Sequence, residues 1–236
     1  MSLRPLRLCV VATAFVAVRG APAQSAAEIP RFEPGAFRST TVDNPLFPLK
    51  PGTVYVFEVK EDDETSLDSI TVTSNVKRVA GVQAIVVHDR VRRGGRITED
   101  TYDWYAQDTV GNVWYLGEDT RAYKFARFFS RSGSWQAGEK GAQPGIIMLG
   151  RPRVGASYRQ EYRKGSAEDM GRVISVGETV TVPAGKFTGC ITTEDWSPLE
   201  KGVLEHKTYC PGVGVVRELT VSGGNERSEL KSIVRP

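Results

Sequence analysis

The stretch Asp100–Thr120, with the sequence DTYDWYAQDTVGNVWYLGEDT, decides the fold class, because it has the pattern of a β-hairpin with aromatic residues on both faces. Pairing its two strands about the central turn DTVG places Trp104 opposite Tyr115 and Tyr105 opposite Trp114. Successive residues of a strand point to opposite sides of a sheet, so we expect the two pairs on opposite faces. One pair can serve the core. The other lies among polar residues, which favours the wall of a cavity or solvent.

Short alternating or β-branched runs recur on both sides of this hairpin, and helical periodicity is rare. The pattern predicts an all-β domain built as a single, strongly curved antiparallel sheet or a partly open barrel; the alternative is a β-sandwich. Residues 132–154 are the least regular part, and they predict a long loop or a short helix. Strands are expected at residues 54–60, 70–75, 83–92, 97–107, 112–117, 122–130, 157–163, 172–182, 190–196, 204–209, 213–221 and 228–234.

The first residues of the chain have the three-part layout of a secretory signal peptide. Two arginines precede an apolar run at residues 8–18, and Ala21-Pro22-Ala23 follows as a small-x-small cleavage site. A membrane span needs roughly 20 apolar residues, and this run is about half as long. The sequence therefore predicts a signal peptide at residues 1–23, export, and no membrane span.

Charge and length limit the remaining possibilities. The chain has 31 Lys+Arg and 28 Asp+Glu, and three arginines of the leader account for the whole excess. Nucleic-acid binding needs a basic face, which a neutral mature chain does not predict, and the Arg-rich segment 90–96 is interpreted as a solvated turn. About 210 mature residues suit one domain. We expect a poorly ordered segment at 24–41 and a single β-rich domain at 42–236.

Cys190 and Cys210 are the two cysteines of the mature chain, and they flank a predicted hairpin whose midpoint is residue 200. Symmetric pairing places them directly opposite each other, where a cross-strand disulfide is possible. Such a bond persists in an exported protein. Closing a loop of this length is expected to stabilise the fold by about 3 kcal/mol in the chain-entropy model.

The same register sets Glu194 opposite His206. A carboxylate beside an imidazole is the minimal part of an acid–base pair, and it is also the pattern of a plain surface ion pair. No G-x-S-x-G nucleophile elbow accompanies it. His88 and His206 lack the spacing of metal ligands, so the sequence predicts no metal site and no cofactor.

Seven runs of the sequence are similar to those of one family. They are residues 44–52 (NPLFPLKPG), 100–120, 144–148, 158–162, 167–170, 182–187 (VPAGKF) and 209–214 (YCPGVG). Across nearly the whole mature chain they resemble a family of uncharacterised, exported bacterial proteins, conserved but of unknown function. The resemblance implies a bacterial protein of the periplasm or the medium, and it brings no activity or catalytic residue. Members often have Ala where this chain has Cys210, which implies that the disulfide is particular to this chain. The motifs V-P-x-G-x-F and G-V-G-x-V also resemble curved-sheet periplasmic proteins of the lipoprotein-carrier type.

These observations favour a non-enzymatic binding module for a small apolar or sugar-like ligand, with Tyr105, Trp114 and Trp135 lining the site. One alternative is a hydrolase that uses Glu194 and His206. Another is a structural module that interacts with the cell envelope.

Overall fold

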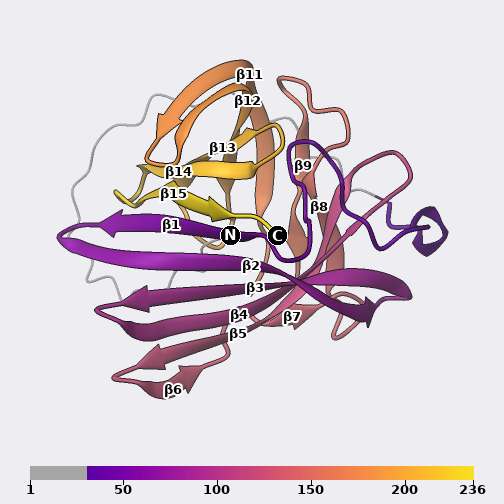
Figure 1. Cartoon of the computed structure of the whole chain (residues 1–236). Helices are drawn as coiled ribbons and strands as arrows, with labels where there is room; N and C mark the ends of the chain where they lie inside the picture. The colour runs from indigo at the N-terminus through magenta and orange to yellow at the C-terminus, as the bar shows by residue number, and fades with distance from the viewer. Residues whose placement is uncertain (1–30) are drawn as a thin grey trace.

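The computed structural model describes residues 31–236, so the predicted signal peptide and the start of the segment at 24–41 lie outside the described residues (Figure 1). Strands dominate this part of the chain. Within residues 31–236 the one helical element is a 3-10 turn at Pro34–Ala36, and no helix is long and apolar enough to span a membrane.

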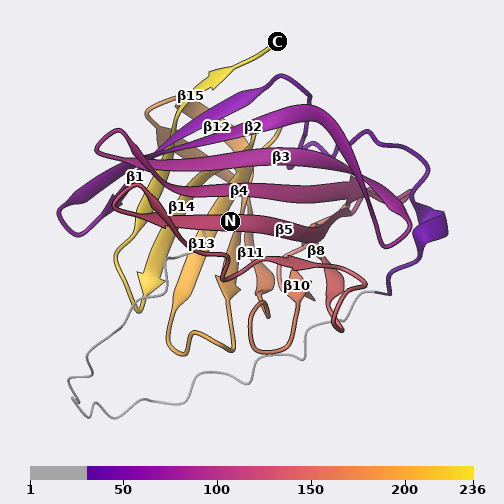
Figure 2. The same ribbon diagram turned by 90° about the horizontal axis from the view of Figure 1, so that it is seen from below.

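Fifteen strands form one antiparallel sheet that is not closed into a barrel, which confirms the predicted curved sheet. The sheet order is β10-β8-β5-β4-β3-β2-β1-β15-β14-β13-β12-β11-β9, with β6 and β7 added beside β5. Figures 1 and 2 show the sheet folded over, so that β2–β5 and β11–β14 face each other. The strands are β1 (Val54–Glu61), β2 (Glu64–Val79), β3 (Val82–Arg93), β4 (Arg96–Gln107), β5 (Val113–Lys124), β6 (Arg127–Ser130), β7 (Trp135–Gln136), β8 (Gln143–Met148), β9 (Ser157–Arg159), β10 (Glu161–Tyr162), β11 (Met170–Val182), β12 (Gly185–Trp196), β13 (Leu204–Cys210), β14 (Gly214–Ser222) and β15 (Arg227–Val234).

The first and the last strand of the chain meet in the middle of the sheet. β1 pairs with β15, so the seam between them joins the N-terminal strands to the C-terminal strands. The outer strands are short: β9 pairs with β11 at one end of the sheet, and β10 pairs with β8 at the other. A single residue, Gln160, separates β9 from β10.

The pairing predicted for the aromatic hairpin is wrong. Tyr105 pairs with Tyr115, and Trp104 pairs with Gly117. The turn holds one more residue than expected, because Asp108 Oδ1 accepts the backbone N–H groups of the second and fourth residues after it. A bulge then shifts the register between Trp104 and Tyr105. It lies beside Gly117, whose φ of +133° is a conformation that side chains rarely adopt.

Residues 132–154, expected to form a long loop or a short helix, contain the strands β7 and β8 instead. The apolar run Ile146–Met148 explains the difference, since its three side chains are buried and it pairs with β5. Period-2 alternation is missing from a strand that is buried on both faces, so the sequence pattern did not reveal it.

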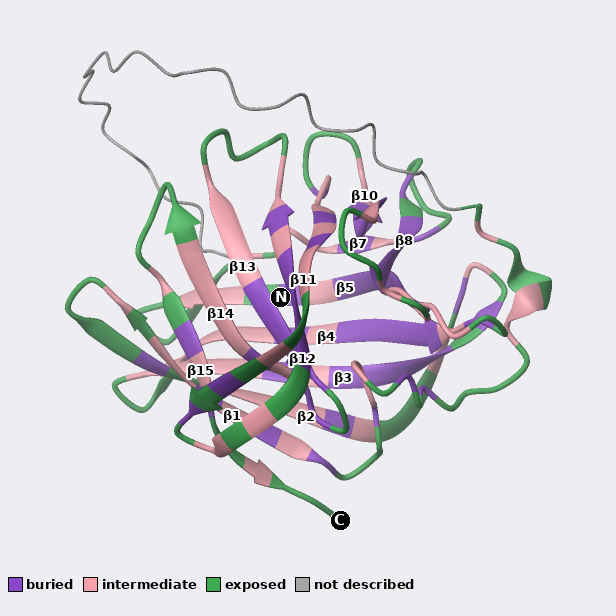
Figure 3. Ribbon diagram, turned by 90° about the horizontal axis from the view of Figure 1, so that it is seen from above, coloured by how far each residue is buried: buried purple, intermediate pink, exposed green. Residues whose placement is uncertain are grey.

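The main hydrophobic core gathers buried side chains from β1–β5 and from β11–β15. Figure 3 shows buried residues on β3, β4 and β5 and exposed residues in the outer loops. A second, smaller cluster contains Trp114, and Phe32 and Phe37 pack against it. The segment at 31–41, expected to be poorly ordered, therefore supplies two of the contacts of Trp114.

Candidate ligand-binding cavity

A cavity of about 480 Å³ lies between the two halves of the folded sheet. Its walls come from β1–β5 on one side, from β13–β15 on the other, and from residues 47–49. Side chains alternate between the two faces of a strand, so every second residue of these strands points inward. Phe57, Ile70 and Val87 line the apolar part in this way. Tyr55 and Tyr105 add ring faces.

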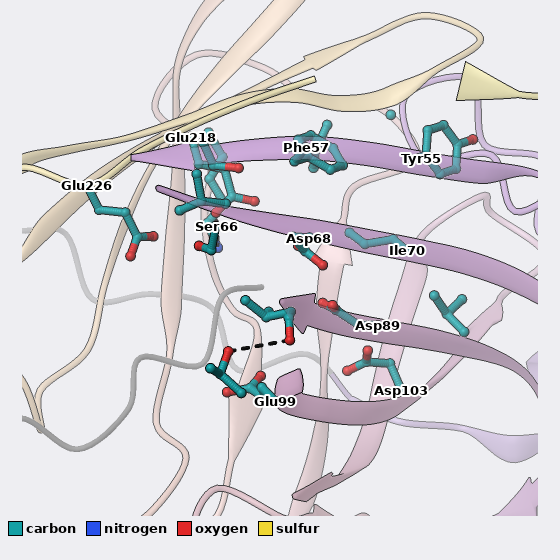
Figure 4. A pocket seen from close by; sticks show the side chains of 18 of the residues that line it. Tyr55, Phe57, Ser66, Asp68, Ile70, Asp89, Glu99, Asp103, Glu218 and Glu226 are labelled. Atoms are coloured by element: carbon teal, nitrogen blue, oxygen red, sulfur yellow. Dashed lines mark hydrogen bonds and ion pairs between the residues drawn. The ribbon is translucent and has the colours of Figure 1, made fainter. Parts of the chain in front are cut away.

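The polar part of the wall is a row of acidic side chains from neighbouring strands. Asp68 on β2, Asp89 on β3 and Asp103 on β4 all line the cavity, as does Glu99 (Figure 4). The three aspartates are 9 %, 6 % and 6 % exposed, respectively. Asp68 and Asp89 also hydrogen-bond each other. This buried, acidic row lies beside the apolar side chains of the same cavity wall.

Burial shifts the titration of these carboxyls upward, because a low dielectric disfavours the charged form. Burial raises the pKa of Asp89 well above its ordinary value, and the nearby charge of Asp68 adds to the effect. Burial also raises the pKa of Asp68. The pKa of Asp103 rises to about 6 through burial, although the Tyr115 hydroxyl donates a hydrogen bond of 2.7 Å to its Oδ1 and works against the rise. Burial raises the pKa of Glu99 to about 8.

One lysine is buried across the cavity from this row. Lys207 on β13 is 5 % exposed, and its Nζ lies 3.5 Å from Asp195 Oδ2 and 3.9 Å from Glu218 Oε2. Burial works to lower the pKa of Lys207, but the charges of Glu218 and Asp195 outweigh it and raise the pKa well above the ordinary value. Lys207 therefore stays charged and is neutralised by the protein itself.

The three aromatic residues predicted to line one site lie in different places. Tyr105 lines the cavity, and its ring stacks on Tyr115 at a centroid distance of 5.0 Å. Trp114 points to the opposite face of β5 from Tyr115, and its Nε1 donates to Asp108 Oδ2 at 2.8 Å. Trp135 does not line this cavity; it packs edge-on against Tyr115 and donates from Nε1 to Glu161 Oε2 at 2.9 Å.

Glu194 and His206 lie opposite each other as predicted, but they stand outside the cavity. His206 Nε2 is 3.7 Å from Glu194 Oε2, and Arg172 Nη2 is 2.5 Å from Glu194 Oε1. All three side chains are partly exposed. This arrangement is that of a surface ion-pair network on β11–β13.

The register predicted for the hairpin of β12 and β13 is confirmed, since Ile191 pairs with Tyr209 and Thr192 with Thr208. Cys190 and Cys210 lie at its end with their Cα atoms 4.2 Å apart and their sulfur atoms at disulfide-bonding distance. Both side chains are fully buried.

The carboxyls of the cavity were not among the candidate residues of the sequence. A signal for one of them was present: Asp103 is two residues from Tyr105, so the two share a face of β4. The pairing of strands that are distant in sequence was needed to bring Asp68 and Asp89 to the same place. Within residues 31–236 no group of three or more His, Cys, Asp or Glu side chains has an arrangement suited to a metal ion.

Comparison with known proteins assigns no family to the chain. No family model matches the chain, and no curated protein matches it. One solved structure, the crystal structure of a putative lipoprotein from Parabacteroides distasonis ATCC 8503, is similar, with 16% sequence identity and a TM-score of 0.45. The match covers 84% of this chain and 100% of that chain.

Proposed function

We propose that the protein is an exported, non-enzymatic binding module whose cavity takes a small ligand with an apolar or sugar-like body. The observation that carries this proposal is the cavity itself, whose volume of about 480 Å³ lies in the usual range for small-molecule sites. Tyr55, Phe57 and Tyr105 offer ring faces to such a ligand, and carboxyls beside them offer hydrogen-bond acceptors.

Export is part of the proposal and rests on two independent features. One is the signal-peptide layout of residues 1–23. The other is the pair Cys190 and Cys210, because disulfides persist in oxidising compartments such as the periplasm and the medium.

The ligand-contacting residues of the proposal differ from those that the sequence suggested. Tyr105 remains one of them. Trp114 and Trp135 have a structural role instead, since each donates its indole N–H to a carboxylate of the protein, Asp108 and Glu161 respectively. The hydrolase alternative gains no support from the geometry, because Arg172 holds Glu194 at the surface and neither Glu194 nor His206 faces the cavity.

Titration with 1-N-phenylnaphthylamine, a neutral apolar fluorophore, tests the proposal. We expect its emission to rise in the presence of the protein and to saturate at one site. Ile70→Trp should abolish the signal by filling the cavity, since Ile70 points into it (Figure 4). Leu67→Trp is the matched control, because Leu67 lies on the outer face of the same strand and is 41 % exposed.

Competition by apolar compounds and by neutral sugars then identifies which of the two ligand bodies binds. Equal binding by wild type and Ile70→Trp would show that the fluorophore binds elsewhere, and no binding of the fluorophore or of any competitor would contradict the proposal.

A further inference from the structure

The cavity wall has a strong excess of acidic side chains. Eight carboxyl residues line it against three basic ones, Arg93, Lys124 and Lys207. Two of these cations have partners within the protein: Arg93 pairs with Glu64, and Lys207 is held by Asp195 and Glu218. Acidic side chains thus dominate the part of the cavity that a ligand would occupy.

Two oxygen atoms at the centre of the acidic row have no donor from outside the row. Asp68 Oδ1 and Asp89 Oδ1 are buried, and among the described residues no N–H or O–H group of another residue donates to them; the hydrogen bond between the two carboxyls is the contact that they share. Both side chains are more than nine-tenths buried and project into the cavity from neighbouring strands (Figure 4). Leaving a buried polar atom without a partner costs about 1–3 kcal/mol in general. Such a pair of acceptors is therefore poised for a donor that comes from outside the protein.

We propose that the cavity selects ligands in which an apolar body carries a protonated amine, with the ammonium group between Asp68 and Asp89. This inference rests on the proposed function and names its ligand class. An ammonium group has three N–H donors, so it can take the place of the proton that the two carboxyls share, which is released to the solvent. It then satisfies both Oδ1 atoms at once and neutralises the ionised pair. Phe57 and Ile70 flank this position and contact the apolar body.

The same geometry disfavours two other ligand head groups, a carboxylate and an alcohol. A carboxylate at the end of an apolar chain would meet the acidic row and be repelled. An alcohol of the same length can donate one hydrogen bond, so it leaves one of the two acceptors unsatisfied. Charge and donor number thus give the expected order of affinity: amine, then alcohol, then carboxylate.

Displacement of bound 1-N-phenylnaphthylamine by octylamine, 1-octanol and octanoate at pH 7 tests the order. These three compounds share one chain length and differ in the head group. We expect octylamine to displace the fluorophore at a concentration about tenfold lower than octanol, a ratio that corresponds to one charge-assisted hydrogen bond. Octanoate should be the weakest.

Three variants locate the effect. Asp89→Asn and Asp68→Asn keep the shape of the side chain and remove its ability to ionise against a bound ammonium group, so each should bring octylamine and octanol to within about twofold of each other. Glu58→Gln is the control, because it removes a carboxyl next to Phe57 that forms ion pairs with Lys60 and Lys231 outside the cavity. It should retain the wild-type preference. Burial disfavours the charge of Asp89, so Asp89→Asn is expected to fold.

The outcomes separate this inference from the proposed function. Binding of the fluorophore with equal displacement by octylamine and octanol would overturn the amine preference and leave the binding module intact. A preference that survives in both aspartate variants would also overturn it. If neither the fluorophore nor octylamine binds, both the amine preference and the proposed binding function are contradicted.

Discussion

Glu99 keeps its proton at neutral pH because burial raises the pKa of its carboxyl to about 8 from an ordinary value of 4.5. The folded state therefore holds a proton that the unfolded chain releases at lower pH. By linkage, the stability that this group contributes is complete below about pH 4.5 and is lost as the pH rises through 8. Asp103, with a pKa of about 6, adds to the loss at a lower pH.

Glu99→Gln is expected to remove most of this dependence. At pH 8.5 the variant should exceed the wild type in free energy of unfolding by about 2 kcal/mol, because it no longer carries a buried charge. At pH 4.5 the two proteins should be nearly equal. Urea denaturation at the two pH values measures the difference. Glu200→Gln, which replaces an exposed carboxyl, is the control and should follow the wild-type profile.

Prediction of single residues from the sequence succeeded where local pairing was enough. Cys190 with Cys210 and Glu194 with His206 came from one symmetric hairpin, and the structure has that register. Tyr105 was expected on a face that meets solvent or the wall of a cavity, and it lines the cavity. The partner assigned to it was wrong, because the side chain of Asp108 lengthens the turn. Whether Tyr105 contacts a ligand stays a proposal.

The β12–β13 hairpin depends on its cysteine pair, which closes a loop with a sequence separation of 20. The exported protein should be lighter by two hydrogens than the reduced chain, as mass spectrometry can show. Reduction should lower the free energy of unfolding by about 3 kcal/mol in the chain-entropy model, without loss of the fold. The double variant Cys190→Ala/Cys210→Ala should be destabilised at least as much, because it also leaves small cavities in the core. Two thiols that react with an alkylating agent in natively exported protein would contradict the pairing.

The turn between β5 and β6 is built from residues that do not favour it. Phe125 and Ala126 have φ values of +52° and +59°, which is the type I′ arrangement that Asn-Gly prefers. A residue with a Cβ atom costs about 1 kcal/mol in this conformation. Ala126→Gly should therefore raise the free energy of unfolding by about 1 kcal/mol, measured by chemical denaturation. Ala126→Ser retains the Cβ atom and should bring no gain.

Most elements could be predicted from the sequence, because alternation and turn residues are local signals. The strands β1, β3, β4 and β13 begin and end within two residues of the predicted ranges. β8 could not be predicted, since a short apolar run buried on both faces lacks alternation. β2 is longer than predicted, because pairing with β1 and β3 extends it into polar sequence at both of its ends.

At the scale of the whole molecule, the cavity exists because the sheet curves enough to set β2–β4 opposite β13–β15. The sequence predicted a strongly curved sheet but not which faces would meet. That information lies in the pairing of β1 with β15, which are separated by most of the chain. No local pattern marks such a pair, and the location of the acidic row depends on it.

The pairing of β1 with β15 also determines when, during synthesis of the chain, the sheet can be completed. β1 is made before the other strands, and its residues Val54–Lys60 pair with Arg227–Val234, so its hydrogen bonds to β15 cannot form until that distant segment has been made. Contacts between segments so distant in sequence form slowly, because bringing the two segments together lowers the conformational entropy of the intervening chain before the strand pairing contributes favourable free energy. The N-terminal strands can form hairpins while the chain is still being made, but the sheet cannot become continuous until β15 has been made. The sheet thus stays incomplete until its last strand has been made, and this late completion suits the proposed export of the chain.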